Sequence, residues 1–260
     1  MIVEKLKWKY RKDGLLPTIR ALVKYPFWIA YRTISEAPLR RKYARMLQRG
    51  TAQERFTQIY EENLWKSDES GSGGGSELTH TEQVRARLPK FVEKYQIERI
   101  VDAPCGDLNW MKLILPEMDV DYIGLDIVPS VIERNRQAFQ SDRIRFEVAD
   151  LSTDPIPSCD LVVARDFLFH LSFTDIDAYL RNLAKTDYRY VLTTTHIVEP
   201  GFENSDIVTG DFRRIDLTKA PFRIDSKAPV ESFEDHPEGH SVPRKMILVR
   251  KEDMPTALTF

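Results

Sequence analysis

Short apolar runs alternate with amphipathic stretches from residue 99 onward. The apolar runs predict strands, and the stretches with apolar residues three and four positions apart predict helices. The predicted strands are 99–103, 121–126, 143–148, 159–165, 188–195 and 245–249, and the predicted helices are 107–115, 129–140 and 174–185. Strands that alternate with helices form a parallel sheet with helices on both faces. The pattern therefore predicts a doubly wound α/β fold.

Residues 51–98 predict two helices around a polar loop. Thr51 and Glu54 have the spacing of a capping box, as do Thr79 and Glu82, so a helix is expected after each pair. Pro89 should kink or divide the second helix. Between the helices lies 67–76, a Gly/Ser-rich stretch that on composition alone is typical of a flexible linker.

Residues 1–50 predict a basic and aromatic helical extension. They hold 13 Lys and Arg against 3 Asp and Glu, a balance of +10, which leaves −12 for residues 51–260 because the whole chain has −2. Three interpretations stay open: packing on the protein or on a second subunit of a homo-oligomer, contact with an anionic membrane surface, and nucleic-acid binding. No nucleic-acid-binding motif accompanies the charge, so we expect no nucleic-acid partner.

The first candidate ligand-binding stretch is 99–110, where a predicted strand is followed by the turn Ala103-Pro104-Cys105-Gly106-Asp107. Gly106 lets the backbone approach a ligand. Twenty residues further on, the next strand ends in Asp126, a position where an acid accepts hydrogen bonds from ribose hydroxyls. Both a nicotinamide dinucleotide and S-adenosylmethionine carry such a ribose.

The turn itself distinguishes these two cofactors. A pyrophosphate favours G-x-G-x-x-G, whereas this turn has a single glycine, and its proline lacks an N–H group. Asp102 and Asp107 would repel a dianion but tolerate the sulfonium and ammonium of S-adenosylmethionine. The residues therefore favour S-adenosylmethionine.

The order and spacing of these motifs resemble the class I S-adenosylmethionine-dependent methyltransferases over about residues 55–250. Residues 101–107 resemble the family's first motif, D-x-G-x-G-x-G, with Ala103-Pro104 and Asp107 in place of two glycines. Asp126 matches the ribose acid, and 148–151 matches the stretch whose acid meets the adenine. The stretch 160–166 matches the fourth strand, whose end faces the transferred methyl group.

The resemblance implies a Rossmann-like sheet of seven strands, mostly parallel, with the last strand antiparallel in a hairpin. It also implies a lid over the cofactor in the Gly/Ser-rich loop. The chain would then comprise the extension 1–50, helices and lid in 51–98, and a catalytic domain in 99–260. The implied cofactor-binding residues are Trp65, Asp102, Ala103, Pro104, Cys105, Gly106, Asp126, Ile127, Asp150, Leu151 and Arg165.

A narrower resemblance concerns the acceptor. Asp-Ala-Pro-Cys-Gly-Asp, a later Thr-Thr-Thr-His and a Gly-Asp-Phe-Arg stretch resemble bacterial methyltransferases of surface-glycan gene clusters. This implies O-methylation of a sugar, nucleotide-sugar or lipid-linked glycan. The alternatives are a methyltransferase for a small secondary metabolite and a non-catalytic module that only binds the cofactor.

A general base is needed if the acceptor is a hydroxyl, and three residues near the ends of the fourth and fifth strands could serve. His196 ends a strand and is the first choice, followed by His170 and Asp166. Arg213 and Arg214 could hold an acidic or phosphorylated acceptor. His196, Asp206, Asp211, His236 and His240 lack the spacing of metal ligands, so no metal site is predicted. Some sugar O-methyltransferases use magnesium, so metal dependence stays open.

Cys105 and Cys159 are the two cysteines and should be reduced thiols, which favours a cytoplasmic protein. The start of the chain is charged and does not resemble a signal peptide. The extension could still place the enzyme on the inner face of the membrane.

Overall fold

The computed structural model describes residues 42–260, so the predictions for residues 1–41, including membrane or subunit contact, lie outside the described part. The chain divides into two compact units, Met1–Gln48 and Arg49–Phe260. Residues 42–47 of the first unit are helical. All that follows concerns the second unit.

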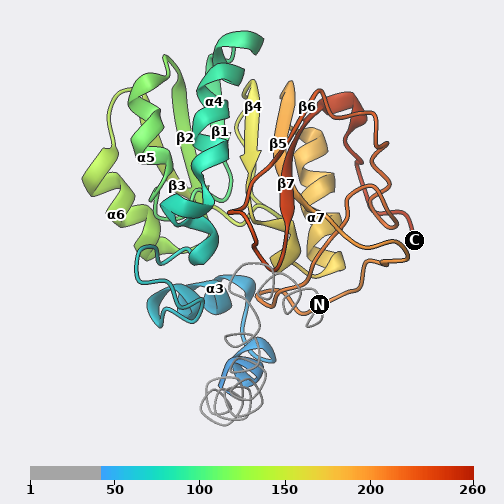
Figure 1. The fold of residues 1–260 in the computed structure, drawn as a ribbon. Coiled ribbons are helices and arrows are strands. Elements are labelled where there is room, and N and C mark those ends of the chain that lie inside the picture. Colours follow the sequence, from blue (N-terminus) through green and yellow to red (C-terminus); the bar gives the residue numbers. More distant parts are fainter. Residues whose placement is uncertain (1–41) are drawn as a thin grey trace, which may run out of the picture. The chain divides into compact units, whose positions relative to one another are not determined.

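A seven-stranded sheet forms the centre of this unit, in the order β3-β2-β1-β4-β5-β7-β6 (Figure 1). The strands are β1 (Arg99–Asp102), β2 (Asp121–Asp126), β3 (Ile144–Val148), β4 (Leu161–Ala164), β5 (Tyr190–His196), β6 (Glu231–Glu234) and β7 (Arg244–Arg250). Strands β1 to β5 run parallel, and β7 pairs antiparallel with both β5 and β6. The predicted Rossmann-like fold is thereby confirmed.

Helices cover both faces of the sheet. The α-helices are α3 (Ala52–Glu61), α4 (Glu82–Tyr95), α5 (Met111–Ile114), α6 (Pro129–Phe139) and α7 (Phe173–Lys185). Single 3-10 turns occupy Gly74–Ser76, Leu78–His80, Leu115–Glu117, Leu168–His170 and Lys251–Asp253.

The alternation of side chains along the strands builds two separate cores. In β4, Leu161 and Val163 face the core formed with α4, α5 and α6, whereas Val162 and Ala164 face the core formed with α7. Ile215 and other apolar residues of the long segment after β5 complete the second core. All four β4 side chains are buried, as expected for a central parallel strand.

The first predicted capping box is confirmed. The backbone N–H of Glu54 donates to the hydroxyl of Thr51 at 3.2 Å, and the N–H of Thr51 donates to the Glu54 carboxylate at 2.7 Å. These bonds satisfy two backbone donors that the first turn of a helix leaves without partners.

The second predicted capping box, at Thr79, is wrong. Helix α4 follows Thr81, whose hydroxyl donates to the carbonyl of Glu77 and does not cap the helix. The carboxylate of Asp235, far along the chain, instead accepts the N–H of Val84 at 3.2 Å. A cap supplied by a residue directly after β6, about 150 positions away, leaves no local signal in the sequence.

Two other helix predictions differ from the structure. Pro89 lies inside α4, which runs on as one helix, so the predicted division does not occur. Helix α5 begins at Met111, later than predicted, because Gly106 and Leu108 both have positive φ angles, +54° and +55°. Residues in that conformation cannot belong to a right-handed helix.

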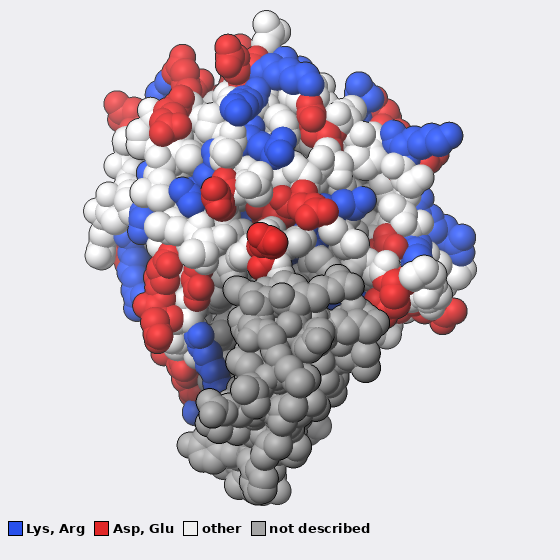
Figure 2. All heavy atoms as spheres, viewed as in Figure 1, with Lys and Arg blue, Asp and Glu red and all other residues white. Residues whose placement is uncertain are grey.

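The surface of the unit carries charges of both signs. On the face seen in Figure 2, Lys and Arg side chains are interspersed with Asp and Glu. Of the helices within residues 42–260, none is long and apolar enough to cross a bilayer.

Candidate active site

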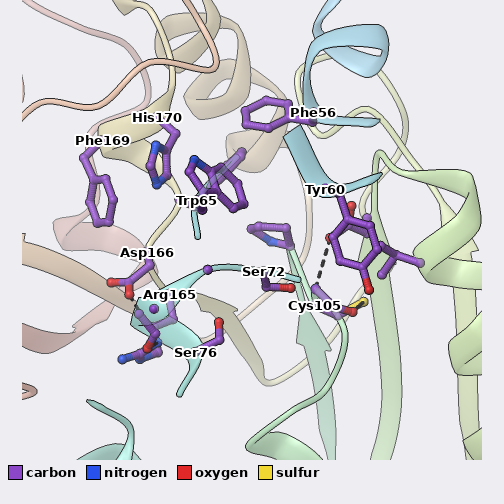
Figure 3. Close-up of a pocket in the computed structure, with 18 of the residues that line it drawn as sticks. Phe56, Tyr60, Trp65, Ser72, Ser76, Cys105, Arg165, Asp166, Phe169 and His170 are labelled. Atoms are coloured by element: carbon purple, nitrogen blue, oxygen red, sulfur yellow. Dashed lines mark hydrogen bonds and ion pairs between the residues drawn. The ribbon is translucent and has the colours of Figure 1, made fainter. Parts of the chain in front are cut away.

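A cavity of about 360 Å³ lies at the carboxyl ends of the central strands (Figure 3). Asp102 at the end of β1, Asp126 at the end of β2, and Arg165 and Asp166 directly after β4 line it. This is the edge at which open parallel sheets bind their ligands.

The turn after β1 is tied to the end of β2. The Gly106 N–H donates to Asp126 Oδ2 at 3.0 Å, and the Val128 N–H donates to Asp126 Oδ1 at 2.9 Å. A Cβ atom on Gly106 would lie 2.4 Å from the Ser72 hydroxyl oxygen, and its φ is +54°, so only glycine fits. Asp126 is buried, and burial raises the pKa of its carboxyl to about 6.

Asp102 is a second buried carboxyl that lines the cavity. Its Oδ2 accepts a hydrogen bond of 2.6 Å from the hydroxyl of Tyr122. Burial raises the pKa of Asp102 to about 7, because the surroundings solvate the charged form poorly. A cationic group bound nearby would favour the charged carboxylate.

Asp107 holds the Gly/Ser-rich loop, residues 67–76, against this turn. Its carboxylate accepts hydrogen bonds from the Ser70 hydroxyl at 2.9 Å and the Gly71 N–H at 2.9 Å. In return, the Asp107 N–H donates to the Ser72 hydroxyl at 3.0 Å. The loop is thus hydrogen-bonded in place, and its residues 72–76 line the cavity.

We expect Asp107→Ala to release this loop. The variant loses the acceptor for Ser70 and Gly71, which should cost about 1–3 kcal/mol of stability and weaken cofactor binding. Limited proteolysis within 67–76 and calorimetry with S-adenosylhomocysteine measure the two effects. Asp68→Ala, at an exposed position of the same loop, is the control and should change neither. Equal behaviour of both variants would contradict this role of Asp107.

Arg165 joins three segments beneath the cavity. Its Nε donates to Asp235 at 2.8 Å, its Nη1 to the Gly75 carbonyl at 2.8 Å, and its Nη2 to the His80 carbonyl at 3.1 Å. The Arg165 side chain is 4% exposed, and every one of its nitrogens has a partner. Arg165 therefore connects the end of β4 to the loop and to the approach to α4.

Asp166 is the counter-ion of two arginines. Its Oδ2 lies 3.2 Å from Arg165 Nη1 and 3.1 Å from Arg244 Nη2, and its Oδ1 accepts from the Thr194 hydroxyl at 3.1 Å. Burial alone would raise the pKa of Asp166, but the two guanidiniums and this hydrogen bond lower it. A carboxylate held in this way is a weak proton acceptor.

His170 lines the cavity beside Trp65 (Figure 3). Its Nδ1 lies 2.8 Å from the carbonyl oxygen of Asp211. A carbonyl only accepts, so Nδ1 carries the proton in the neutral ring and Nε2 keeps a free lone pair. Burial lowers the pKa of His170, which favours this neutral form at pH 7.

His196 has the opposite arrangement and is not among the residues that line the cavity. Its Nδ1 accepts the Ile215 N–H at 3.1 Å, so the proton of the neutral ring is on Nε2. Burial lowers the pKa of His196 to about 4. Its ring packs edge-on against Phe169, with 5.1 Å between centroids, and Phe169 itself lines the cavity. His196 therefore contacts the protein's own backbone and Phe169 and does not face the cavity directly.

The residues that the sequence predicted for the site divide into two groups. Lining the cavity are Trp65, Asp102, Pro104, Cys105, Gly106, Asp126, Ile127, Arg165, Asp166 and His170. Outside its lining are Ala103, Asp150, Leu151, His196, Arg213 and Arg214.

Neither predicted acceptor-binding arginine reaches the cavity lining. The Arg213 guanidinium lies 4.9 Å from the ring centroid of Phe173 and donates to the carbonyl of Leu171. Arg214 forms a two-pronged ion pair with Glu199, at 2.8 Å for each contact. Their side chains are therefore engaged with the protein itself.

Several lining residues were not predicted from the sequence: Phe56, Tyr60, His80, Trp110, Phe212 and Arg244. Phe56 and Tyr60 are one helical turn apart in α3, so helical spacing alone could have placed them on one face. His80 and Arg244 have no such local signal.

Among residues 42–260, no group of three or more His, Cys, Asp or Glu is arranged to hold a metal ion. Cys105 and Cys159 are both free thiols.

Comparison with known proteins indicates the class of enzyme to which this site belongs. Residues 101–186 match a family model described as a methyltransferase domain. A search of curated proteins with this sequence finds no match.

Solved structures share the fold at low sequence identity. The S-adenosylmethionine-dependent methyltransferase SibL is 18% identical, with 93% of this chain and 76% of that chain covered and a TM-score of 0.54. Burkholderia thailandensis 1,6-didemethyltoxoflavin-N1-methyltransferase is 14% identical, with 81% and 89% covered and a TM-score of 0.55. This chain spans 56% of human N-acetylserotonin methyltransferase, which is 17% identical over 77% of this chain, and that TM-score of 0.47 is too low to support a common fold.

The fold and the family match together define a class I methyltransferase domain. Residues 101–186 therefore belong to a methyltransferase domain, the class of enzyme for which the sequence predicted S-adenosylmethionine as the cofactor. The cavity fits S-adenosylmethionine, because buried carboxyls lie at the ends of β1 and β2. The turn between them is close-packed at Gly106, where a side chain would collide with Ser72.

Cofactor affinity should fall as the pH is lowered through about 7 to 6. The pKa values of Asp102 and Asp126 are raised to about 7 and about 6, so both carboxylates become protonated in this range. Protonation removes negative charge that an ammonium and ribose hydroxyls would meet. Calorimetry with S-adenosylhomocysteine between pH 5 and 8 measures the effect.

Asp126→Asn is the matched variant. It should weaken S-adenosylhomocysteine by about 1–3 kcal/mol at pH 8 and remove the part of the pH dependence near 6. An affinity of the wild type that does not change from pH 8 to pH 5 would refute this role for the two carboxyls.

Proposed function

We propose that this methyltransferase transfers the methyl group to a hydroxyl oxygen of a sugar or glycan intermediate, with His170 as the general base. The observation that carries the proposal is the tautomer of His170. Its Nδ1–H is committed to the Asp211 carbonyl, which leaves the Nε2 lone pair to accept a proton at the cavity.

The protein's part in the reaction is alignment and removal of the proton. When bound, the cofactor supplies an electrophilic methyl group on a positively charged sulfur. While the acceptor oxygen is methylated, His170 Nε2 would take the hydroxyl proton. Holding the acceptor in line with the methyl group lowers the barrier further.

Aromatic rings beside His170 support a ring-shaped acceptor. The Trp65 and Phe169 centroids lie 5.0 Å and 4.6 Å from that of His170, and Phe212 lies 6.0 Å away. Flat apolar rings of this kind pack well against the C–H face of a sugar. The narrower sequence resemblance favours a nucleotide-sugar or lipid-linked glycan, which would place the enzyme in the cytoplasm of a bacterium.

A planar aromatic metabolite is the second candidate acceptor. Phe212 lines the cavity yet is 47% exposed, an apolar side chain at the entrance that a flat aromatic ligand would cover. The Burkholderia enzyme that shares the fold was crystallised with 1,6-didemethyltoxoflavin, a small molecule.

A panel assay separates these functions. The full chain is incubated with S-adenosylmethionine labelled in its methyl group and with nucleotide-sugars, lipid-linked glycans or phenols. Label on a sugar oxygen is the expected result. Transfer to phenols alone would favour the second candidate, and binding of S-adenosylhomocysteine without any transfer would favour a non-catalytic module.

A further inference from the structure

Arg244 lines the cavity and has two buried hydrogen-bond donors without partners. It is the first residue of β7, lies opposite His196 of β5 in the sheet, and is 6% exposed. Among the described residues, neither its Nε nor its Nη2 has a hydrogen-bond partner. These two N–H groups form one edge of the guanidinium, the edge that binds a carboxylate or a phosphate with two parallel hydrogen bonds.

Buried donors without partners are costly, so they need an explanation. Asp166 lies 3.1 Å from Arg244 Nη2 and compensates its charge, but it does not satisfy the two donors. Arg165, in the same cavity, has partners for all of its nitrogens. Arg213 also has unpartnered nitrogens, but it is not part of the cavity lining.

His80 adds a second unpartnered group to the same cavity. Its Nδ1 is buried without a hydrogen-bond partner among the described residues, and its ring lies 5.0 Å from that of His240, which also lines the cavity. Burial lowers the pKa of His80, and His240 and Arg244 lower it further. A neutral His80 can donate through Nδ1. Its backbone is held by the hydrogen bond from Arg165.

The strand order places Arg244 away from the cofactor side of the cavity. The ribose acid Asp126 is on β2 and Asp102 is on β1, whereas Arg244 is on β7, beyond β4 and β5. Neighbouring strands are about 4.8 Å apart, so β7 lies roughly 10 Å past β4. This is the side where an acceptor would meet the transferred methyl group.

We propose that Arg244 and His80 form an anion subsite that holds a carboxylate or phosphate of the acceptor. The proposal rests on the proposed function in that the acceptor occupies this cavity. It narrows the acceptor class to charged molecules, such as a uronic acid or a sugar phosphate, with the hydroxyl to be methylated placed toward His170.

The test uses the full chain saturated with S-adenosylhomocysteine. Glucose, glucuronic acid, glucose 6-phosphate and inorganic phosphate are titrated by calorimetry into the wild type, Arg244→Gln, Arg244→Lys and Lys245→Gln. Lys245→Gln is the matched control, because it removes one positive charge at the next position of β7 and Lys245 does not line the cavity.

The wild type should bind at least one charged probe more tightly than glucose. Arg244→Gln should weaken that probe by about tenfold or more, and Arg244→Lys should restore part of the affinity, since lysine keeps the charge but not the paired donors. Lys245→Gln should change the affinity by less than about twofold. Which charged probe responds distinguishes a carboxylate from a phosphate.

Three outcomes would overturn the subsite. They are no binding of any charged probe by the wild type at millimolar concentration, an equal loss for charged probes and glucose, and a loss of S-adenosylhomocysteine affinity in Arg244→Gln. The last would assign the donors to the cofactor. Anion binding through Arg244 without transfer to any hydroxyl would support the subsite and refute the proposed function. Transfer to neutral sugars at a rate that Arg244→Gln does not change would refute the subsite and support the proposed function.

Discussion

Replacing His170 with glutamine should lower the turnover number by about 10²–10⁴-fold and leave the affinity for S-adenosylhomocysteine nearly unchanged. Glutamine can still donate to the Asp211 carbonyl, which His170 meets at 2.8 Å, but its amide does not take up a proton at neutral pH. The loss of turnover would therefore reflect lost proton transfer, because the contact with the segment around Asp211 is kept. Single-turnover kinetics with a labelled cofactor measures it.

His196→Gln is the comparison that makes this result specific. In the structure His196 accepts the Ile215 N–H, so its replacement should reduce stability by about 1–3 kcal/mol while turnover changes little. A large loss of turnover in His196→Gln together with normal turnover in His170→Gln would return the base to His196. Harmless substitution of both residues would show that the acceptor needs no base.

The pH profile gives an independent check of the same prediction. A base acts when it is deprotonated, and burial lowers the pKa of His170 below its ordinary value of 6.5. The midpoint of the fall in turnover at saturating cofactor should therefore lie below pH 6.5. A midpoint above pH 7 would contradict His170 as the base.

The sequence predicted the sheet well because its signal is local. Buried parallel strands are short apolar runs, and Leu161–Ala164 is an example in which every side chain is buried. Gly106 and Asp126 were recognisable for the same reason. Gly106 lies in the turn after β1 and Asp126 ends β2, so each follows from the position of its strand. The β6 strand, by contrast, lies in a polar stretch whose residues alone gave no strand signal.

The catalytic prediction was harder because it depends on contacts between distant segments. His196 ends β5, where the topology does place ligands, but the backbone of Ile215 returns to cover its Nδ1. No periodicity in the polar stretch 196–240 reveals that return. Arg213 and Arg214 were chosen because arginine binds carboxylates and phosphates through paired hydrogen bonds. In the structure, Arg213 contacts Phe173 and Arg214 pairs with Glu199.

Asp235→Ala should be the most destabilising single change near the site, at about 3–5 kcal/mol. Asp235 is fully buried, accepts Arg165 Nε at 2.8 Å and accepts the Val84 N–H at the start of α4 at 3.2 Å. Its removal leaves a buried guanidinium without one of its two carboxylate partners and a helix terminus without its cap. Urea unfolding with and without S-adenosylhomocysteine measures the change.

Two further variants resolve what Asp235 contributes. Asp235→Asn keeps the acceptor for Val84 but loses the charge facing Arg165, so it should lie between the wild type and Asp235→Ala. Glu231→Gln removes the surface ion pair with Lys94 at 2.6 Å and should have only a small effect, because water screens that pair. Since Arg165 also holds Gly75 and His80 beside the cavity, Asp235→Ala should weaken cofactor binding as well. If Asp235→Ala were as stable as Glu231→Gln, the buried pair could not be what connects α4, β4 and the loop at the cavity.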